Sequence, residues 1–459
     1  MSLPRERRPA NASCRLRRNL ERERVEEKFC VGCAKKVITP PLGTPLYGYP
    51  DYESRKATAV HDELYVNAAV FGGDGPLAAL VSMDLCTMQA ALADRIRSAV
   101  GEAIGIPAEH IILCLIYTHS GPCAAATAIC DPATDTYINE TLIPAVLGAV
   151  CEAAADMHPA RLGIGTAQSR VGINRRQILA DGRTVLGQNP YGCFDPEMTV
   201  LAFVGEDDKP LLNIIHYGAH ATASGKVPVI TRDWPGYMVD RMEAQTGAMS
   251  FFINGAEGDV GPRLSSGKTT GDLTHAAELG GQAAMDAMLA YRAVREYRDV
   301  DFRTVTGTLT LPYRPFPSRK EIEDTLADME TKPLTGHDLR KYNVLKQRLA
   351  VLDSGGEIPV SRTLGQVLFA FNDAVLVPFP FEMFSEITVR LRQYSPFGYT
   401  LGISNANGTL AYLPSKEQIP RGGYEVKKFT DSHIFPLADN TDDVIIVQNL
   451  KLIESLFAQ

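Results

Sequence analysis

The stretch LAALVSMDL, residues 77–85, is an apolar run with Asp84 near its end. Such a run is typical of a strand that is buried on both faces of a sheet. Residues 90–104 follow with helical spacing, and residues 110–117 (HIILCLIY) form a second apolar run. The order strand, helix, strand over this part of the chain predicts a layered α/β fold.

The segments on either side continue this pattern. We expect a helix at residues 137–157 and a strand at 161–166, then two strands at 198–204 and 211–217 whose turn-rich connection indicates a hairpin. Further helices are expected at residues 234–246, 274–294, 381–392 and 444–456, with a charged helical pair within 318–354. Strands are expected at 250–254, 302–313 and 399–404, and two strands within 366–378, divided at Asn372 and Asp373. The predicted fold class is therefore α/β, with mixed β-sheets layered with helices.

The N-terminal segment, residues 1–28, carries eight arginines and almost no apolar residues. A signal peptide needs an apolar core, so this segment is interpreted as a disordered basic leader, with a basic arm or an organelle-targeting segment as the alternative. Residues 29–459 are expected to form one domain. A boundary near residue 300 is the alternative, but candidate functional residues occur on both sides of it.

Composition and charge limit the classes of partner. The 459 residues carry a net charge of −8, whereas surfaces that bind nucleic acid or anionic membranes are basic. No apolar run reaches the roughly 18–20 residues that span a bilayer. We therefore expect a cytoplasmic protein with a small-molecule substrate, and a homo-oligomer is left open.

All nine cysteines lie in the first half of the chain. Cys30 and Cys33 have the spacing of a redox or zinc motif, but no second pair of this kind follows. The spacing is interpreted as coincidental, and the thiols are expected to be reduced.

Polar residues follow the second apolar run, where its predicted strand ends. His119 lies in the segment YTHSGP, residues 117–122, in which Gly121 and Pro122 turn the chain. Ligands of open α/β sheets bind beyond the carboxyl ends of strands, which favours a catalytic role. A histidine that caps the strand end through hydrogen bonds is the alternative.

His216 and His220 stand four residues apart at the end of another predicted strand, so both side chains are expected on one face. Two imidazoles that converge there suit a divalent metal, and zinc is well matched to neutral nitrogen ligands. A buried histidine with satisfied hydrogen bonds is the alternative at each position.

The loop NGAEGDVGPR, residues 254–263, follows a short predicted strand. Its glycines allow the backbone to approach a ligand closely, and its amides are candidates for an oxyanion pocket. Asp259 is a candidate for orienting a catalytic side chain. A tight loop without chemistry is the alternative.

Together these segments resemble the neutral (non-lysosomal) ceramidase family over about residues 31–430. Each motif is modest alone, but six in the same order are specific for the superfamily. The family's THTHSGP-type motif corresponds to IYTHSGP (116–122), its zinc-histidine strand to residues 213–220, and its NxGDVSP-type loop to residues 254–263. Its PGE motif corresponds to Pro380, Phe381 and Glu382 at the start of a predicted helix. Its N-terminal and C-terminal signatures correspond to residues 37–49 and 406–425.

The resemblance implies the fold of that family's catalytic domain and zinc-dependent cleavage of an amide bond by a metal-activated water. His119 would move protons, and Arg175 and Tyr424 would hold the negative charge that develops on the reacting carbonyl. By position, the zinc ligands of the family correspond to Tyr117, His220, Glu382 and Tyr412.

Two departures from the family concern the metal and the loop. Tyr117 replaces the first zinc histidine, and a neutral phenol, with a pKa of about 10, is a poor ligand. The outcomes left open are ligation by His119, weak metal binding and loss of the metal. The serine of the DVSP segment is Gly261, which removes any hydroxyl that would grip an amide.

The context of the motifs also bears on the substrate. The signal peptide and the C-terminal β-sandwich of the ceramidases are not recognised in this sequence, nor is an exposed apolar segment for bilayer contact. The expected function is therefore a zinc-dependent amidohydrolase of a small soluble substrate, with ceramide less expected. The alternatives are a metal-free small-molecule-binding pseudoenzyme, and a lyase or isomerase that uses His119 as base while Arg175 clamps a carboxylate.

Overall fold

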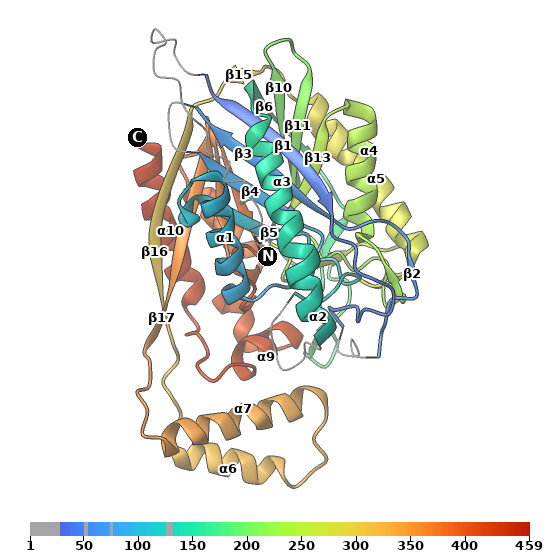
Figure 1. Cartoon of the computed structure of the whole chain (residues 1–459). Helices are drawn as coiled ribbons and strands as arrows, with labels where there is room; N and C mark the ends of the chain where they lie inside the picture. Colours follow the sequence, from blue (N-terminus) through green and yellow to red (C-terminus); the bar gives the residue numbers. More distant parts are fainter. Residues whose placement is uncertain (1–27, 50–53, 74–76, 125–131) are drawn as a thin grey trace, which may run out of the picture.

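The computed structural model describes residues 28–49, 54–73, 77–124 and 132–459 (Figure 1). The predicted basic leader, apart from Lys28, lies outside the described residues.

A nine-stranded mixed sheet forms the centre of the molecule (Figure 1). Its strands lie in the order β13-β11-β10-β6-β1-β3-β4-β5, and β15 pairs with β6. β4 pairs with β5 in parallel, as does β11 with β13, and β10 and β11 form the predicted antiparallel hairpin. The strands are β1 (Cys30–Val37), β3 (Tyr65–Gly72), β4 (Ala78–Met83), β5 (Ile111–Leu115), β6 (His158–Gln168), β10 (Glu197–Gly205), β11 (Pro210–Tyr217), β13 (Met249–Asn254) and β15 (Arg298–Asp299).

A second sheet of four strands, in the order β16-β17-β18-β20, lies against one face of the central sheet. In β3, Ala69 and Phe71 face this second sheet, and the ring centroid of Phe71 is 4.9 Å from that of Phe371. Ala68 and Val70 face the other way, into a core shared with helices. Because both faces are covered, the strands are apolar along their length. The four strands are β16 (Phe302–Pro312), β17 (Ser361–Phe371), β18 (Ala374–Pro378) and β20 (Tyr399–Ile403).

Helices cover the outer face of each sheet, which gives four layers in the order helices, sheet, sheet, helices. α3 covers β1 and β3 beside α1, α4 and α5 cover the other half of the central sheet, and α8 and α10 cover the second sheet. The predicted α/β class is therefore confirmed. The helices are α1 (Ala90–Ile104), α2 (Pro132–Tyr137), α3 (Ile143–Ala155), α4 (Asp233–Thr246), α5 (Leu273–Arg292), α8 (Ser385–Tyr394), α9 (Tyr424–Asp431) and α10 (Thr441–Phe457).

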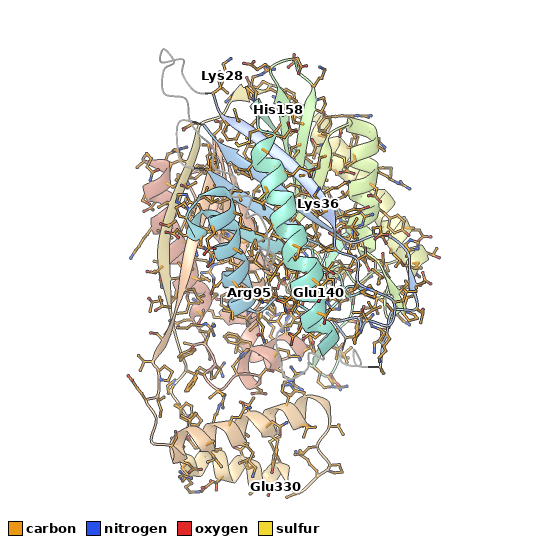
Figure 2. All side chains as sticks on the ribbon, viewed as in Figure 1. Lys28, Lys36, Arg95, Glu140, His158 and Glu330 are labelled. Carbon is orange, nitrogen blue, oxygen red and sulfur yellow. The ribbon has the colours of Figure 1, made fainter. Side chains whose placement is uncertain are left out.

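Contrary to our expectation, one helical stretch, Thr134–Ala155, has the length and apolar composition of a membrane-spanning helix. Within it, α3 packs on β1 and β3, and Val146, Ala149 and Val150 are buried in the core. Its outer side and that of α1 carry charged residues, including Glu140 and Arg95 (Figure 2). The apolar side of this stretch is therefore used in packing against the sheet.

The charged segment at 318–354 forms the predicted helical pair, α6 (Arg319–Met329) and α7 (Gly336–Asp353). The pair projects from the ends of β16 and β17 (Figure 1), with Glu330 at the far end of α6 (Figure 2). Ser318 and Glu321 form a capping box at the start of α6. The two helices enclose a small core of Ile322, Leu326, Met329 and Leu345.

The predicted helix at residues 381–392 is wrong at its start. Phe381–Met383 forms the strand β19, which pairs in parallel with β21 (Ala411–Leu413), and α8 begins at Ser385. The partner strand comes from a later part of the chain, so the local pattern could not reveal the pairing. The pairing places Glu382 directly opposite Tyr412. Further short pairs are β2 (Ala59–Val60) with β12 (Val229–Ile230), β7 (Gly172–Asn174) with β14 (Val260–Pro262), and β8 (Arg176–Ile178) with β9 (Thr184–Leu186).

Candidate functional site

Two strand ends meet at the centre of the candidate site. His119 follows β5 and His220 follows β11. Thr118 pairs with Ala221 in a parallel bridge, and the amide of His119 donates to the carbonyl of Ala221 at 3.2 Å. The ring centroids of His119 and His220 are 5.8 Å apart as a result. The two segments singled out separately in the sequence therefore form one site.

Five further side chains join these histidines, one from the same segment as His119 and four from other segments. Tyr117 follows β5, Arg175 lies between β7 and β8, and Tyr424 begins α9. Glu382 and Tyr412 come from opposed positions of β19 and β21. All of these side chains are buried except that of Tyr424, which is 39% exposed. The site therefore reaches solvent beside Tyr424.

His220 and Glu382 face each other without a hydrogen bond between them. Nδ1 of His220 lies 2.7 Å from the carbonyl oxygen of Glu257 and 3.1 Å from that of Val260, so Nδ1 carries the proton. Nε2 then presents its lone pair to Oε2 of Glu382 at 3.3 Å, and neither atom has a hydrogen-bond partner. Burial lowers the pKa of His220 well below its usual value, so the ring is neutral. Burial raises the pKa of Glu382, and either a proton or a metal cation between the two lone pairs would satisfy both atoms.

Two phenols surround the Glu382 carboxylate. Tyr117 and Tyr412 lie beside it, and each favours its charged form by lowering its pKa. Burial and the charge of Glu382 raise the pKa of each phenol well above its ordinary value. Both tyrosines are therefore neutral in this arrangement, and their oxygens lie next to the unpartnered pair of His220 and Glu382.

Tyr117 occupies a strained backbone position. Its φ is 68°, in the left-handed region that bulky residues rarely adopt. Its ring centroid lies 5.1 Å from that of His119 and 5.1 Å from that of His220. The position that holds a zinc histidine in the resembling family thus lies in the site but carries a ring with a different donor.

His119 is held by packing rather than by hydrogen bonds. Nδ1 and Nε2 are both buried without partners. The ring lies edge-on to Tyr49, at 4.9 Å between centroids, and a Cβ on Gly48 would come within 2.4 Å of its Cγ. Burial first, and the nearby His220 second, lower the pKa of His119 well below its usual value. The ring is therefore neutral, with one nitrogen protonated and the other able to accept a proton.

Arg175 is fixed by a carboxylate that sequence reasoning did not single out. Its Nε donates to Glu425 at 2.9 Å and its Nη2 to the hydroxyl of Tyr412 at 3.0 Å. Glu425 also accepts from Arg176 at 2.8 Å, and it is 1% exposed. The sequence signal for Glu425 was its place after Tyr424 in a family-like motif. Sequence reasoning passed over it because glutamates are seldom buried.

Asp259 holds the loop rather than a catalytic histidine. Its carboxylate accepts from the amide and hydroxyl of Ser385 at 2.8 and 2.7 Å and from Asn174 at 3.0 Å. Its carbonyl accepts from the amide of Arg175 at 2.7 Å. Burial raises the pKa of Asp259 to about 6. The contacts orient the start of α8 and the turn that carries Arg175.

Three amides of the loop that was expected to form an oxyanion pocket are used within the fold. Those of Gly255, Gly258 and Val260 donate to the carbonyls of Tyr217, Met383 and Glu257, and so are already used. The contribution of the loop to the site is instead the carbonyl of Glu257, which orients His220. The Glu257 carboxylate is itself buried and accepts from Asn405 at 2.5 Å.

The expected pairing of His216 with His220 is wrong. His216 lies within β11, and its Nε2 is 2.8 Å from the carbonyl oxygen of Gly402. His220 lies beyond the strand end, so the alternation of side chains along a strand does not relate the two residues. Cys30 and Cys33 both lie in β1 and, at a spacing of three, point to opposite faces. No disulfide joins the cysteines that the structure describes.

Gly261, which replaces the serine of the resembling motif, lies against a neighbouring side chain. A Cβ at Gly261 would stand 2.7 Å from Cγ2 and 2.8 Å from Cβ of Thr269, and 3.4 Å from Cβ of Arg175. The space that a serine would need is therefore filled by Thr269.

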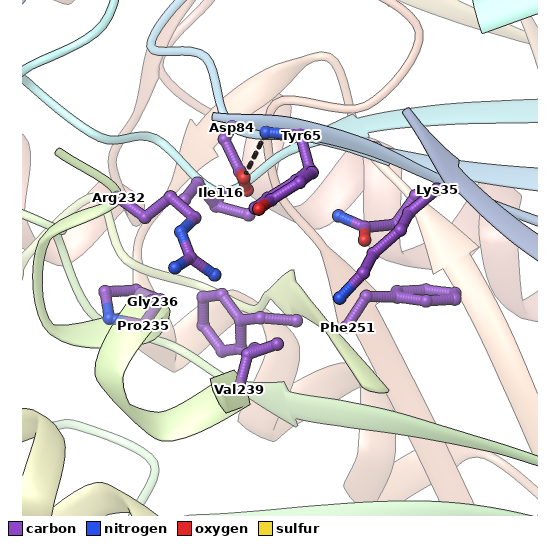
Figure 3. A pocket seen from close by; sticks show the side chains of 11 residues that line it. Lys35, Tyr65, Asp84, Ile116, Arg232, Pro235, Gly236, Val239 and Phe251 are labelled. Carbon is purple, nitrogen blue, oxygen red and sulfur yellow. Dashed lines mark hydrogen bonds between the residues drawn. The ribbon is translucent and has the colours of Figure 1, made fainter. Parts of the chain in front are cut away.

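Two cavities lie outside this group of residues. One, about 10 Å³, has room for about one water molecule. Figure 3 shows Asp84, Arg232 and Lys35 around it, with Asp84 accepting from the amide of Tyr65 at 2.7 Å. The other has a volume of about 330 Å³ and lies beside β19 and β21.

No group of three or more His, Cys, Asp or Glu side chains among the described residues is arranged as a metal site. The candidate donors are instead one imidazole, one carboxylate and two phenol oxygens, from His220, Glu382, Tyr117 and Tyr412.

The chain is similar over most of its length to solved structures of ceramidases. It matches the crystal structure of neutral ceramidase from Pseudomonas aeruginosa with a TM-score of 0.71 and 18% sequence identity, over 94% of this chain and 75% of that chain. A structure of a ceramidase complexed with C2 gives a TM-score of 0.69 and 18% identity, over 94% of this chain and 76% of that chain. No protein-family model and no curated protein matches the sequence. The expected neutral-ceramidase-like fold is therefore confirmed.

Proposed function

We propose that this protein is a zinc-dependent hydrolase that cleaves the amide (C–N) bond of a small, water-soluble substrate. The proposal rests chiefly on His220 Nε2 and Glu382 Oε2, which are buried 3.3 Å apart without hydrogen-bond partners. The fold that the chain shares with ceramidases supports amide-bond cleavage.

The residues present fit a divalent metal. An imidazole nitrogen and a carboxylate oxygen are both zinc ligands, and catalytic zinc sites leave one position for water or substrate. The Nδ1–H of His220 donates a hydrogen bond to a backbone carbonyl, which is the usual support of a metal-binding histidine. Tyr412 and Tyr117 supply further oxygen atoms beside Glu382. A bound metal would lower the pKa of water and polarise the substrate carbonyl.

His119 is the side chain that we assign to proton transfer. It is neutral, and its two ring nitrogens are buried without partners beside His220. Such a ring takes a proton from the attacking water and returns it to the leaving amine. The close approach of Gly48 and the edge-on ring of Tyr49 limit its rotation.

Arg175 and Tyr424 are assigned to the negative charge that develops on the carbonyl oxygen. The Arg175 guanidinium is held by Glu425 and lies 5.6 Å from the centroid of the Tyr412 ring. Tyr424 lies edge-on to Tyr412, at 5.9 Å between centroids. A fixed guanidinium and a phenol in a buried site stabilise an oxyanion strongly, because they need no reorganisation.

The surroundings of Tyr424 favour a soluble substrate over a membrane lipid. Lys428 lies 5.5 Å from the centroid of the Tyr424 ring. Burial, and second the charge of Arg340, lower the pKa of Lys428 to about 8, so it is largely protonated at neutral pH. A polar and cationic approach of this kind suits a hydrated substrate, whereas lipid contact needs an apolar rim.

A metal-free small-molecule-binding protein is the second candidate, and the phenol at Tyr117 favours it. A lyase or isomerase would need Arg175 to clamp a carboxylate, but Nε and Nη2 of Arg175 already donate to Glu425 and Tyr412.

Metal content and hydrolysis of N-acyl amino acids, measured on the same preparations, test the proposal. Protein purified without chelator is expected to hold about one zinc per chain and to release free amino acid. His220→Ala should lose both properties, while His158→Ala, which changes an exposed histidine on β6, should keep both.

Full metal content and activity in His220→Ala would overturn the proposal. Wild-type protein with no metal and no spectral change on adding cobalt would favour the binding protein. Product that forms without oxygen from labelled water would favour the lyase or isomerase.

A further inference from the structure

The larger cavity, about 330 Å³, lies on the opposite side of the β19–β21 pair from the candidate site. Phe381 and Ala411 line the cavity, while their neighbours Glu382 and Tyr412 belong to the site. This follows from the alternation of side chains along a strand. The volume is within the range of small-molecule pockets, which begin at roughly 300 Å³.

One wall of the cavity is apolar and aromatic. The ring centroids of Tyr313 and Phe435 lie 5.7 Å apart on this wall. The apolar lining consists of Tyr313, Phe381, Leu410, Phe429, Phe435 and Leu437. A hydrocarbon group placed here would leave water.

The lining also carries groups that can bind an anion. Within the described residues, the guanidinium of Arg362 on β17 has no ion-pair or hydrogen-bond partner. The hydroxyl of Thr409 is buried without a partner, so it too has a hydrogen bond to give. The first turn of α1 borders the cavity with no side-chain cap and no acidic residue, and the amides of Ala90 and Ala91 are not used in the backbone hydrogen bonds of that turn.

The surrounding charge is positive. Burial first, and then nearby cations, lower the pKa of His433 to about 4, so this lining residue is neutral at pH 7. The cations that act on it are Arg362, Arg340, Arg348 and Lys428. The cavity therefore combines an unpaired guanidinium with an apolar wall.

We propose that this cavity binds an amphipathic monocarboxylate, with its carboxylate on Arg362 and Thr409 and its hydrocarbon part against the aromatic wall. A single negative charge matches the one charged side chain in the lining, and a guanidinium pairs with a carboxylate through two parallel hydrogen bonds. This site is separate from the catalytic one and needs no metal.

A tryptophan placed in the wall reports on the cavity. The chain has one tryptophan, Trp234, which is fully buried in α4. In metal-free Phe435→Trp protein, titration with octanoate should change the fluorescence of the introduced tryptophan. The change should saturate with a stoichiometry of one octanoate per chain. Octanol, which lacks the charge, should bind at least tenfold more weakly. Isothermal titration of unmodified protein with octanoate checks the stoichiometry without any substitution.

Arg362→Gln, introduced into the Phe435→Trp protein, should weaken octanoate binding at least tenfold. Arg319→Gln, which changes an arginine on the projecting helix α6, should leave it unchanged. Equal octanoate affinity in a folded Arg362→Gln protein, equal affinity for octanol, or no binding of millimolar octanoate to unmodified protein would each overturn the proposal. Because no metal is present, a failure of the hydrolase proposal leaves these outcomes unchanged.

Discussion

Nε2 of His220 lies 3.3 Å from Oε2 of Glu382, with both atoms buried and neither in a hydrogen bond. His220 comes from the end of a strand in the central sheet, and Glu382 from a short strand paired with β21. Two acceptor atoms held this close cost stability unless a cation lies between them. The pair therefore lowers the stability of the cation-free fold, and the same two atoms provide donors for a bound cation.

Glu382→Gln separates these two effects. The amide removes the buried charge and can donate to His220, so metal-free protein should gain about 1–3 kcal/mol of unfolding free energy. Zinc affinity should fall at least 100-fold, because the carboxylate ligand is lost. Urea unfolding of metal-free protein and competition with a chelator measure the two quantities. Glu417→Gln, an exposed site, should change neither.

Tyr117→His is expected to strengthen metal binding. Histidine tolerates the left-handed backbone of this position better than tyrosine does and supplies a neutral nitrogen toward His220. We expect zinc affinity to rise at least tenfold in chelator competition. Tyr117→Phe keeps the ring but removes the hydroxyl, so it should show no rise. An equal affinity in the histidine and phenylalanine variants would place the metal elsewhere.

Gly261→Ser tests whether Thr269 excludes a side chain from the loop. The new Cβ would stand 2.7 Å from Cγ2 of Thr269, so the variant should lose about 1–3 kcal/mol of unfolding free energy. Adding Thr269→Gly, which removes both contacting atoms, should restore most of that loss. A double-mutant cycle measured by urea unfolding gives the coupling between the two positions. Additive effects would show that the loop relaxes by another route.

Glu425→Gln tests the support of Arg175. It leaves the guanidinium groups of Arg175 and Arg176 buried without their shared carboxylate. Loss of a buried partner of this kind costs roughly 3–5 kcal/mol. Glu206→Gln breaks an exposed pair with Lys28 and should cost less than about 1 kcal/mol. Similar unfolding free energies for the two variants would contradict this assignment.

Asp84 should make stability depend on pH. Burial raises its pKa to about 7, with Asp62 and Asp240 adding to the rise, against the opposing effects of Arg232 and the amide of Tyr65. The folded state thus holds this proton more tightly than the unfolded state does. The contribution of Asp84 to stability is therefore highest below pH 4 and is lost as pH rises toward 7.

Asp84→Asn cannot ionise, so its unfolding free energy relative to wild type should rise by about 2–4 kcal/mol between pH 4 and pH 8. Asp94→Asn, at an exposed position of α1, should show no such trend. Parallel pH profiles for wild type and Asp84→Asn would show that Asp84 ionises normally.

Much of the fold could be predicted because strands and helices carry local signals. The apolar runs at 77–85 and 110–117 became β4 and β5, and the helix between them was predicted with its observed ends. The mistaken helix start at residues 381–384 has a different cause. Strand β19 exists because of its pairing with β21, and an isolated three-residue strand has no periodicity to detect.

The site residues divide in the same way. His119 and His220 stand out because polar residues follow apolar strands, and the family resemblance adds Glu382, Tyr412 and Arg175. Glu257 lay in a loop singled out for other residues, and Glu425 was marked only by its place in a family-like motif, because the burial of each carboxylate depends on distant partners. His216 had the right residue type and spacing, but its partner is a backbone carbonyl in the neighbouring sheet.

The sequence by itself determined the layered α/β architecture, because apolar periodicity is a local property, and its resemblance to the ceramidase family indicated the candidate donors. Only the tertiary structure decided which of those donors face one another. The approach of His220 to Glu382, the neutral phenols around that carboxylate and the cavity behind β19 all depend on segments far apart in the chain. Their distances and charges arise when burial removes water, which no single segment can specify.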